Sequence, residues 1–222
     1  NNGSFGINTD TANYFSNNII SDNGSYGLNI SPGPSGISME LATITNNSGN
    51  GLQAFIAGTI NISESDFSGN ANHGIEIEGA SSVVTSYQVS ASNNNQDGIN
   101  LLNIGSFKLG DSSLTILNGE ACVVSGNSAS GVKLDNVNSI TVTETIFESN
   151  EWSAIYQTGG SSSVISNNIF SSNQNNSQND TNKGGAIYTD MSGVEILSNE
   201  FIDNVATYGG AIYVNSESPF IY

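Results

Sequence analysis

Hydrophobic residues return at a regular interval along the whole chain. A small residue followed by an aliphatic one occurs after a turn at nine places, and most of these places lie about 23 residues apart. A repeat of this length indicates a solenoid, in which each unit buries its apolar face only against its neighbours. We expect the nine aliphatic residues to form one interior column: Ile7, Leu28, Leu52, Ile75, Ile99, Val132, Ile155, Ile187 and Ile212.

An asparagine keeps a fixed distance from these aliphatic residues. It stands five residues before most of them, and a hydrophobic residue usually stands three before the asparagine. Asparagine tolerates the left-handed backbone of tight turns, and its amide both donates and accepts hydrogen bonds. Stacked in register, these amides would form a ladder along the solenoid. The predicted structural ladder consists of Asn23, Asn47, Asn70, Asn94, Asn127, Asn150, Asn173 and Asn204.

A third segment of each repeat alternates between hydrophobic and polar residues. Ile60 and Ile62 are one example, and Ile140 and Val142 are another. Alternation with period two places one set of side chains on one face of a strand. The sequence therefore predicts an all-β fold, a parallel β-helix of about nine coils with three short strands per coil, as a single domain over residues 1–222. A second interior column is expected to contain Phe67, Phe147, Phe170 and Phe201.

Two repeats are about ten residues longer than the others. The extra residues are predicted as polar insertions near 102–113 and 174–183. Long solenoid loops serve binding in some proteins and are merely tolerated in others, and both readings stay open here. The chain begins with NNGSFGI and ends with SPFIY, which suggests a segment of a longer solenoid.

Charge and composition exclude several classes of partner. The net charge is −17, and the only basic residues besides one histidine are three lysines. Phosphate groups need cations, so nucleic acids and anionic membrane surfaces are disfavoured as partners. No apolar run is long enough for a membrane span. The single cysteine, Cys122, forms no intrachain disulfide and is expected to be a small buried residue.

Several short motifs near the C-terminus are similar to those of a known family. GGAIY occurs at 184–188 and 209–213, with FESN at 147–150, FSSN at 170–173 and FIDN at 201–204. These resemble the paired GGAI and FxxN repeats of polymorphic outer membrane proteins, which are bacterial surface-exposed or secreted passenger domains linked to adhesion. The N-terminal repeats resemble the broader right-handed parallel β-helix of surface proteins and carbohydrate-active enzymes. The resemblance, with the coil length, predicts a right-handed helix and an extracellular or cell-surface location.

The residues do not supply a familiar catalytic set. Polysaccharide cleavage of the pectate-lyase type would use a calcium-binding carboxylate cluster with an arginine or lysine base, but this chain has no arginine and its lysines are scattered. The only histidine, His73, occupies a turn position. We therefore expect no enzyme activity, no metal and no cofactor. The alternatives are an end-to-end extracellular filament or sheath subunit, and a polysaccharide-binding or polysaccharide-degrading β-helix.

The outward position after each interior aliphatic residue suggests a binding surface. Tyrosines occupy it in three successive repeats, at Tyr156, Tyr188 and Tyr213, and Glu76 occupies it earlier, with Glu78 two residues on. Stacked tyrosines would form a flat aromatic strip that could contact sugar rings or a protein. The alternative is that tyrosine simply favours strands. The expected partner is a host-cell or matrix glycan or protein, or further copies of the chain as an end-to-end homo-oligomer.

Overall fold

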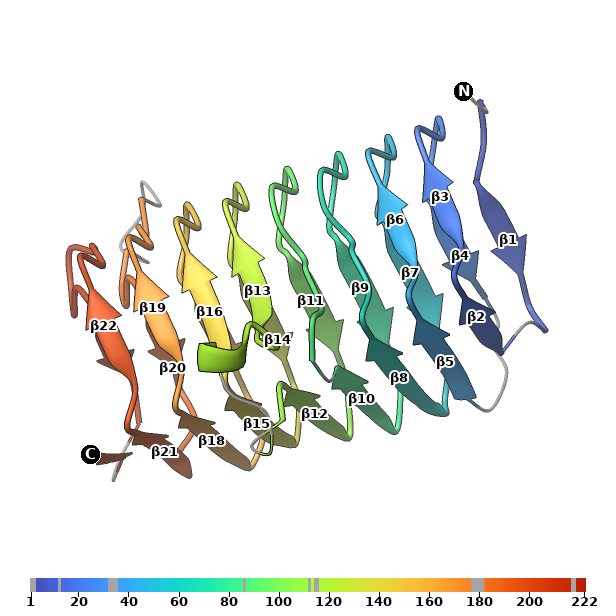
Figure 1. Ribbon diagram of the computed structural model, residues 1–222. Coiled ribbons are helices and arrows are strands. Elements are labelled where there is room, and N and C mark those ends of the chain that lie inside the picture. The colour runs from blue at the N-terminus through green and yellow to red at the C-terminus, as the bar shows by residue number, and fades with distance from the viewer. Residues whose placement is uncertain are drawn as a thin grey trace.

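Short parallel strands follow one another around a rod in the computed structural model, which describes residues 3–11, 13–31, 36–85, 87–111, 113, 116–176, 182–216 and 219–222. Figure 1 shows the strands stacked in successive rungs, where a rung is one turn of the chain. A full rung contributes one strand to each of three sheets. The predicted all-β parallel solenoid is confirmed: nine rungs, which make about eight turns, lie within the described residues.

The first two sheets run the length of the rod. Each has nine strands within the described residues, and every strand pairs in parallel with the equivalent strand one rung away. The first sheet contains β1 (Ile7–Thr9), β4 (Leu28–Ile30), β7 (Leu52–Phe55), β9 (Ile75–Glu78), β11 (Ile99–Leu102), β14 (Val132–Asp135), β17 (Ile155–Thr158), β20 (Ile187–Thr189) and β23 (Ile212–Val214). The second contains β2 (Tyr14–Ser16), β5 (Gly36–Glu40), β8 (Thr59–Ser63), β10 (Ser82–Thr85), β12 (Ser106–Leu109), β15 (Ser139–Thr143), β18 (Ser162–Ser166), β21 (Val194–Leu197) and β24 (Phe220–Ile221).

The third sheet is interrupted in the middle of the rod. Its N-terminal part is the pair β3 (Ile19–Ser21) and β6 (Thr43–Thr45). Its C-terminal part contains β13 (Cys122–Ser125), β16 (Thr145–Glu148), β19 (Ile169–Ser171) and β22 (Glu200–Ile202). Between them, Asp66 and Ser90 continue the register only as isolated parallel bridges. These two rungs therefore keep the path of the rod without forming regular strands in this sheet.

Two interior columns form the core as the repeat predicted. The aliphatic residues of the first sheet pair from rung to rung, as Leu28 does with Leu52 and Ile155 with Ile187. The seven members from Leu28 to Ile187 are fully buried, whereas Ile7 and Ile212 are partly buried. In the third sheet Phe147 stacks on Phe170, with ring centroids 4.9 Å apart and ring planes within 6°. Burial of these side chains in successive rungs supplies the hydrophobic stabilisation that no single rung could provide.

The longer repeats differ in detail from the prediction. Residues 106–109 form the regular strand β12, so the range 102–113 was wrong for the first insertion. The extra residues instead lie between β12 and β13 and include a short 3-10 helix, η1 (Ile116–Asn118), seen in Figure 1. The prediction overlooked the alternation of polar and hydrophobic residues in SFKL, which is the same as in the other strands of this sheet. In the second range, 174–183, residues 177–181 lie outside the described part of the chain.

Candidate functional site

The predicted asparagine ladder is present and continuous over eight rungs. Each amide nitrogen donates to the amide oxygen of the next member, over distances from 2.9 Å to 3.3 Å. The same oxygens also accept the backbone N–H of the preceding member, as Asn150 does from Asn127. Most of the amides donate in addition to a backbone carbonyl one rung back, and Asn127 donates to Ala91. The hydrogen-bonding capacity of this column is used within the protein, so the ladder is scaffold.

A shorter column of stacked amides was missed by the sequence analysis. Its asparagines stand five residues before the last two asparagines of the ladder. Asn168 donates to the side-chain oxygen of Asn199 at 2.9 Å, and its own oxygen accepts the backbone N–H of Thr145. Cys122 pairs with Thr145 in the same register and is completely buried. Burial raises the pKa of its thiol to about 11, so the sulfur is neutral near pH 7. The signal was a pair of asparagines in consecutive rungs, Asn168 and Asn199, at a position that also holds Asn18 and is otherwise filled by varied residues.

Three tyrosines form a row on the outer face of the first sheet. Tyr156 pairs with Tyr188 and Tyr188 with Tyr213 in consecutive strands, and all three side chains are partly exposed. The ring centroids of the first pair are 4.7 Å apart with planes within 11°, and those of the second pair are 5.9 Å apart with planes within 2°. The parallel register of the strands holds the rings in line along the rod.

The rings in this tyrosine row face one another rather than the solvent. Two parallel rings lying side by side in one plane need roughly 6.5 Å between centroids, because carbon atoms approach only to van der Waals distance. Both observed separations are shorter, so the rings are stacked along the rod axis. The tyrosines are therefore stacked, as the sequence predicted, and their ring faces are turned toward one another along the row. The row presents ring edges to the solvent, which favours hydrogen-bonding and edge contacts over sugar stacking.

Charged side chains surround the tyrosine row. Burial raises the pKa of Tyr156 above its usual value, and the carboxylates of Asp190 and Asp135 raise it further. Burial also raises the pKa of Tyr188. The ammonium group of Lys183 lies 4.8 Å from the ring centroid of Tyr213, which is a cation–π contact. The phenols of Tyr156 and Tyr188 thus stay protonated at neutral pH.

The two predicted glutamates lie on the same strand but have different surroundings. Asn50 and Gln53 donate to one oxygen of Glu76, at 2.6 Å and 3.0 Å, and Asn100 donates to the other at 3.4 Å. Glu78 projects from the same face of β9 and forms no side-chain hydrogen bond within the described residues. Glu76 therefore accepts hydrogen bonds from amides of the two neighbouring rungs, and the structure does not bring the two glutamates together with a tyrosine.

The single histidine belongs to a turn column. The backbone N–H of Asp97 lies 3.3 Å from Nδ1 of His73, and the Asp97 carboxylate lies at the same distance from that nitrogen. Asp97 in turn accepts the backbone N–H of Ser130 at 2.9 Å. These contacts tie neighbouring rungs together, as expected of a turn residue. Across the described residues, no group of three or more His, Cys, Asp and Glu side chains could hold a metal ion.

The described residues also contain no helix that is long and apolar enough to cross a membrane.

Comparison with known proteins gives one family match. The family is described as "Right handed beta helix region", and its matches to this chain span residues 1–115 and 106–221. Neither the curated proteins nor the solved structures contain a match to this chain. Together the two matched segments cover nearly all of the rod described above, and this chain belongs to the right-handed β-helix family.

Proposed function

We propose that this β-helix is a non-catalytic domain of a cell-surface or secreted protein and acts in adhesion to a protein on host cells or matrix. The resemblance of its GGAIY and FxxN motifs to the repeats of polymorphic outer membrane proteins supports the surface role. One observation carries the adhesive role: the tyrosine row of Tyr156, Tyr188 and Tyr213 is held in line on an outer face.

A protein partner suits this row better than a sugar ring does. The ring faces that meet along the row are occupied by stacking, so the row offers a sugar no continuous aromatic platform. Partly exposed tyrosines offer apolar edges together with hydroxyl groups, and this combination is enriched at protein interfaces. Stacking also fixes the side chains before binding, so little rotamer freedom is lost on association. The row thus resembles a preorganised set of anchors.

The local charge adds a preference for a partner with basic groups. Asp135 and Asp190 lie near the tyrosines and raise the pKa of Tyr156. The whole chain carries a net charge of −17. Complementary charge on the partner would speed association and make it weaker at high salt. Binding that weakens as salt rises is therefore expected.

A pair of triple variants tests the proposal on cultured cells and immobilised matrix proteins. Changing Tyr156, Tyr188 and Tyr213 to serine removes rings and hydroxyls, whereas changing them to phenylalanine keeps the stacked rings. We expect the serine variant to lose at least about tenfold in affinity, which is 1.4 kcal/mol, and the phenylalanine variant to lose less.

A matched control changes polar residues in the N-terminal half of the same outward row. The variant N29S/N100S alters partly exposed positions without touching the tyrosines, and it should bind as the parent does. If the triple serine variant is folded and still binds cells and matrix proteins like the parent, the adhesive role of the row is wrong.

A further inference from the structure

The tyrosine row brings together side chains that share one kind of reactivity. A phenol loses an electron and a proton to one-electron oxidants, and two of the resulting phenoxyl radicals join through a carbon–carbon bond when their rings meet. The chain has eight tyrosines, and all of them lie in the part of the chain that the structure describes. Within it, tyrosine rings contact one another only from Tyr156 to Tyr188 and from Tyr188 to Tyr213. The row is therefore the place where such coupling requires the least movement.

The parallel register sets the geometry of coupling. Tyr156 and Tyr188 occupy paired positions on neighbouring strands, so their rings repeat along the rod with little rotation. The centroids are 4.7 Å apart and the planes lie within 11°, so the ring faces already meet. The unpaired electron of a phenoxyl radical occupies the π system, and the first bond between two such radicals therefore forms from face to face. A small tilt about the side-chain torsions is enough to bring the hydroxyl-bearing ends together.

The two contacts of the row are not equivalent. The centroids of Tyr188 and Tyr213 are 5.9 Å apart, against 4.7 Å in the first pair. The ammonium group of Lys183 also lies 4.8 Å from the ring centroid of Tyr213, and a cation beside a ring opposes the loss of an electron from it. The carboxylates of Asp135 and Asp190 lie near the first pair instead, and negative charge eases that loss. Distance and charge both favour coupling in the first pair.

The sulfur-containing side chains are shielded from oxidants in solution. Cys122 is completely buried, and the two methionines, Met39 and Met191, are 1% and 2% exposed. Burial also raises the pKa of the Cys122 thiol to about 11, which keeps the reactive thiolate scarce. The single tryptophan, Trp152, is 46% exposed but makes no ring contact with a tyrosine among the described residues. An oxidant therefore meets the partly exposed tyrosine row before it meets sulfur.

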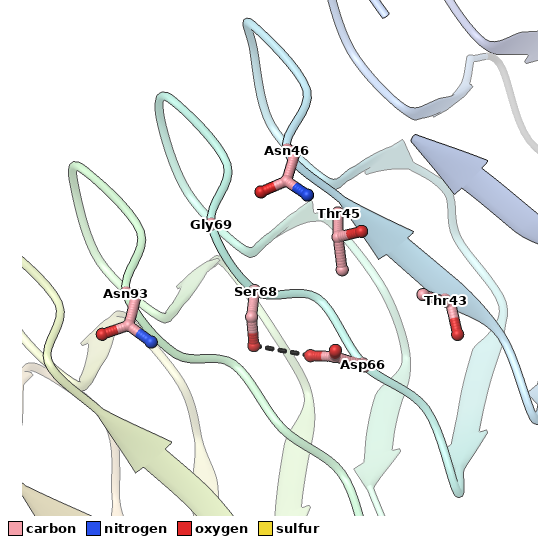
Figure 2. A pocket seen from close by; sticks show the side chains of 7 residues that line it. All are labelled: Thr43, Thr45, Asn46, Asp66, Ser68, Gly69 and Asn93. Carbon is pink, nitrogen blue, oxygen red and sulfur yellow. Dashed lines mark hydrogen bonds between the residues drawn. The ribbon is translucent and has the colours of Figure 1, made fainter. Parts of the chain in front are cut away.

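The outer face of the third sheet shows that register alone does not create this reactivity. Figure 2 shows the break in that sheet, where Thr43, Asp66 and Asn93 belong to three successive rungs. The labelled residues there carry hydroxyl, amide or carboxylate groups, apart from one glycine. Oxidants that take one electron from a phenol leave such groups unchanged. Coupling between rungs needs phenols in register, and the tyrosine row supplies them.

We propose that the tyrosine row is a site of oxidative cross-linking, at which Tyr156 and Tyr188 join as dityrosine and tie the seventh rung to the eighth. Each phenol gives up one electron and one proton, and hydrogen peroxide takes up both pairs through a haem peroxidase and becomes two molecules of water. The two radicals form one bond between ring carbons beside their hydroxyl groups. The hydrogens on those carbons then move to the oxygens, which restores both phenols, so the protein loses two hydrogen atoms in all.

The cross-link would act on the stability of the rod. Tyr156 and Tyr188 are one full rung apart along the chain, so a bond between them restricts the unfolded chain much as a disulfide does. The folded rod already holds the two residues side by side and loses little freedom. Oxidation would therefore stabilise the C-terminal rungs. The proposal does not rest on the adhesive function, although it concerns the same side chains.

The experiment oxidises the full chain, at low protein concentration, with hydrogen peroxide and a haem peroxidase. Dityrosine is measured by its fluorescence, and peptide mass spectrometry locates the link as two peptides joined with the loss of two hydrogens. The expected product is a monomer in which Tyr156 is joined to Tyr188, and its thermal midpoint should lie above that of the untreated chain. The same oxidation in urea should give little of this link, because unfolding removes the register.

Three variants identify the tyrosines that react. Y188F keeps the stacked ring but removes the phenol common to both contacts, so it should lose the link within the monomer. Y213F leaves the closer pair intact and should keep the link. The matched control is Y87F, which removes a partly exposed phenol outside the row and should react as the parent does.

Four results would overturn the proposal. The first is the lack of dityrosine in the oxidised, folded monomer, and the second is a link that maps to other tyrosines or persists in Y188F. The third is an equal yield of the link in urea, and the fourth is a cross-linked monomer whose thermal midpoint is unchanged. No cell or matrix protein enters this experiment, so its failure leaves the adhesive function standing, and a failure of adhesion leaves the cross-link standing.

Discussion

Two aromatic stacks run through neighbouring rungs, one inside the rod and one outside. Inside, Phe147, Phe170 and Phe201 have centroids 4.9 Å and 5.1 Å apart. Outside, the tyrosine row has centroids 4.7 Å and 5.9 Å apart. The parallel register produces both stacks, because equivalent residues in successive rungs always lie side by side. The difference lies in the surroundings: the inner stack removes apolar surface from water, and the outer one leaves ring edges and hydroxyls available.

The inner stack should therefore be much more important for stability. Changing Phe170 to alanine removes a fully buried ring between two others, and we expect the free energy of unfolding to fall by about 3–5 kcal/mol. Urea denaturation followed by circular dichroism measures this change. The control is Phe55→Ala, since the Phe55 side chain is 39% exposed, and its effect should stay below about 1 kcal/mol. Equal effects in the two variants would contradict the distinction between inside and outside.

A polar column inside the rod should matter almost as much as the inner aromatic stack. Asn127→Ala removes hydrogen bonds to Asn94, Asn150 and Ala91 and leaves buried polar groups unpaired. The expected loss is about 3 kcal/mol in the same denaturation assay. Asn95→Ala, at an exposed position beside the ladder, should change stability by less than about 0.5 kcal/mol. An Asn127→Ala effect as small as that would show the ladder to be dispensable.

The outer stack should stabilise the rod only modestly. Tyr188→Ala breaks two ring contacts at a partly exposed position, so the expected loss is about 1–2 kcal/mol. Tyr188→Phe keeps both contacts and should lie within about 0.5 kcal/mol of the parent. The comparison with Phe170→Ala is made under identical conditions. A larger effect at Tyr188 than at Phe170 would reverse the roles assigned to the two stacks.

The smallest expected effect is a loss of stability at high pH. The pKa values of Tyr156 and Tyr188 are raised in the folded protein, above the ordinary value of 10.0. As pH rises above 10.0, the unfolded chain loses these protons first, so the stability from this pair declines until pH passes the folded-state pKa values. The double variant Y156F/Y188F should lose less stability than the parent across this window. Parallel stability curves for the two proteins above pH 10 would contradict the assignment.

The sequence predicted the interior better than the exterior. Leu28, Asn127 and Phe147 recur at fixed intervals because every rung must place the same kind of group against its neighbours. The break in the third sheet had no such signal, since Asp66 and Ser90 keep their place in the repeat and yet form only isolated bridges. Positions that depart from a repeat are harder to interpret than positions that follow it.

The tyrosine row shows a further limit of sequence reasoning. The period-two alternation correctly placed Tyr156 and Tyr188 in register on an outer face. It carried no information on side-chain torsions, which decide whether rings lie flat on the sheet or stand against one another. The sequence left open whether the row contacts a sugar ring or a protein, and the observed stacking favours a protein. Orientation, rather than position, was the part that needed the structure.

The most direct test of the account compares adhesion per folded molecule for an inner and an outer variant. Phe170→Leu alters the inner stack with a residue that still fills the core, and Y156S/Y188S/Y213S removes the outer row. Cell binding is measured for both beside the parent, at matched folded protein concentration. The account predicts parental binding for Phe170→Leu and a loss of at least about tenfold for the triple serine variant. Parental binding by the folded triple variant would contradict it.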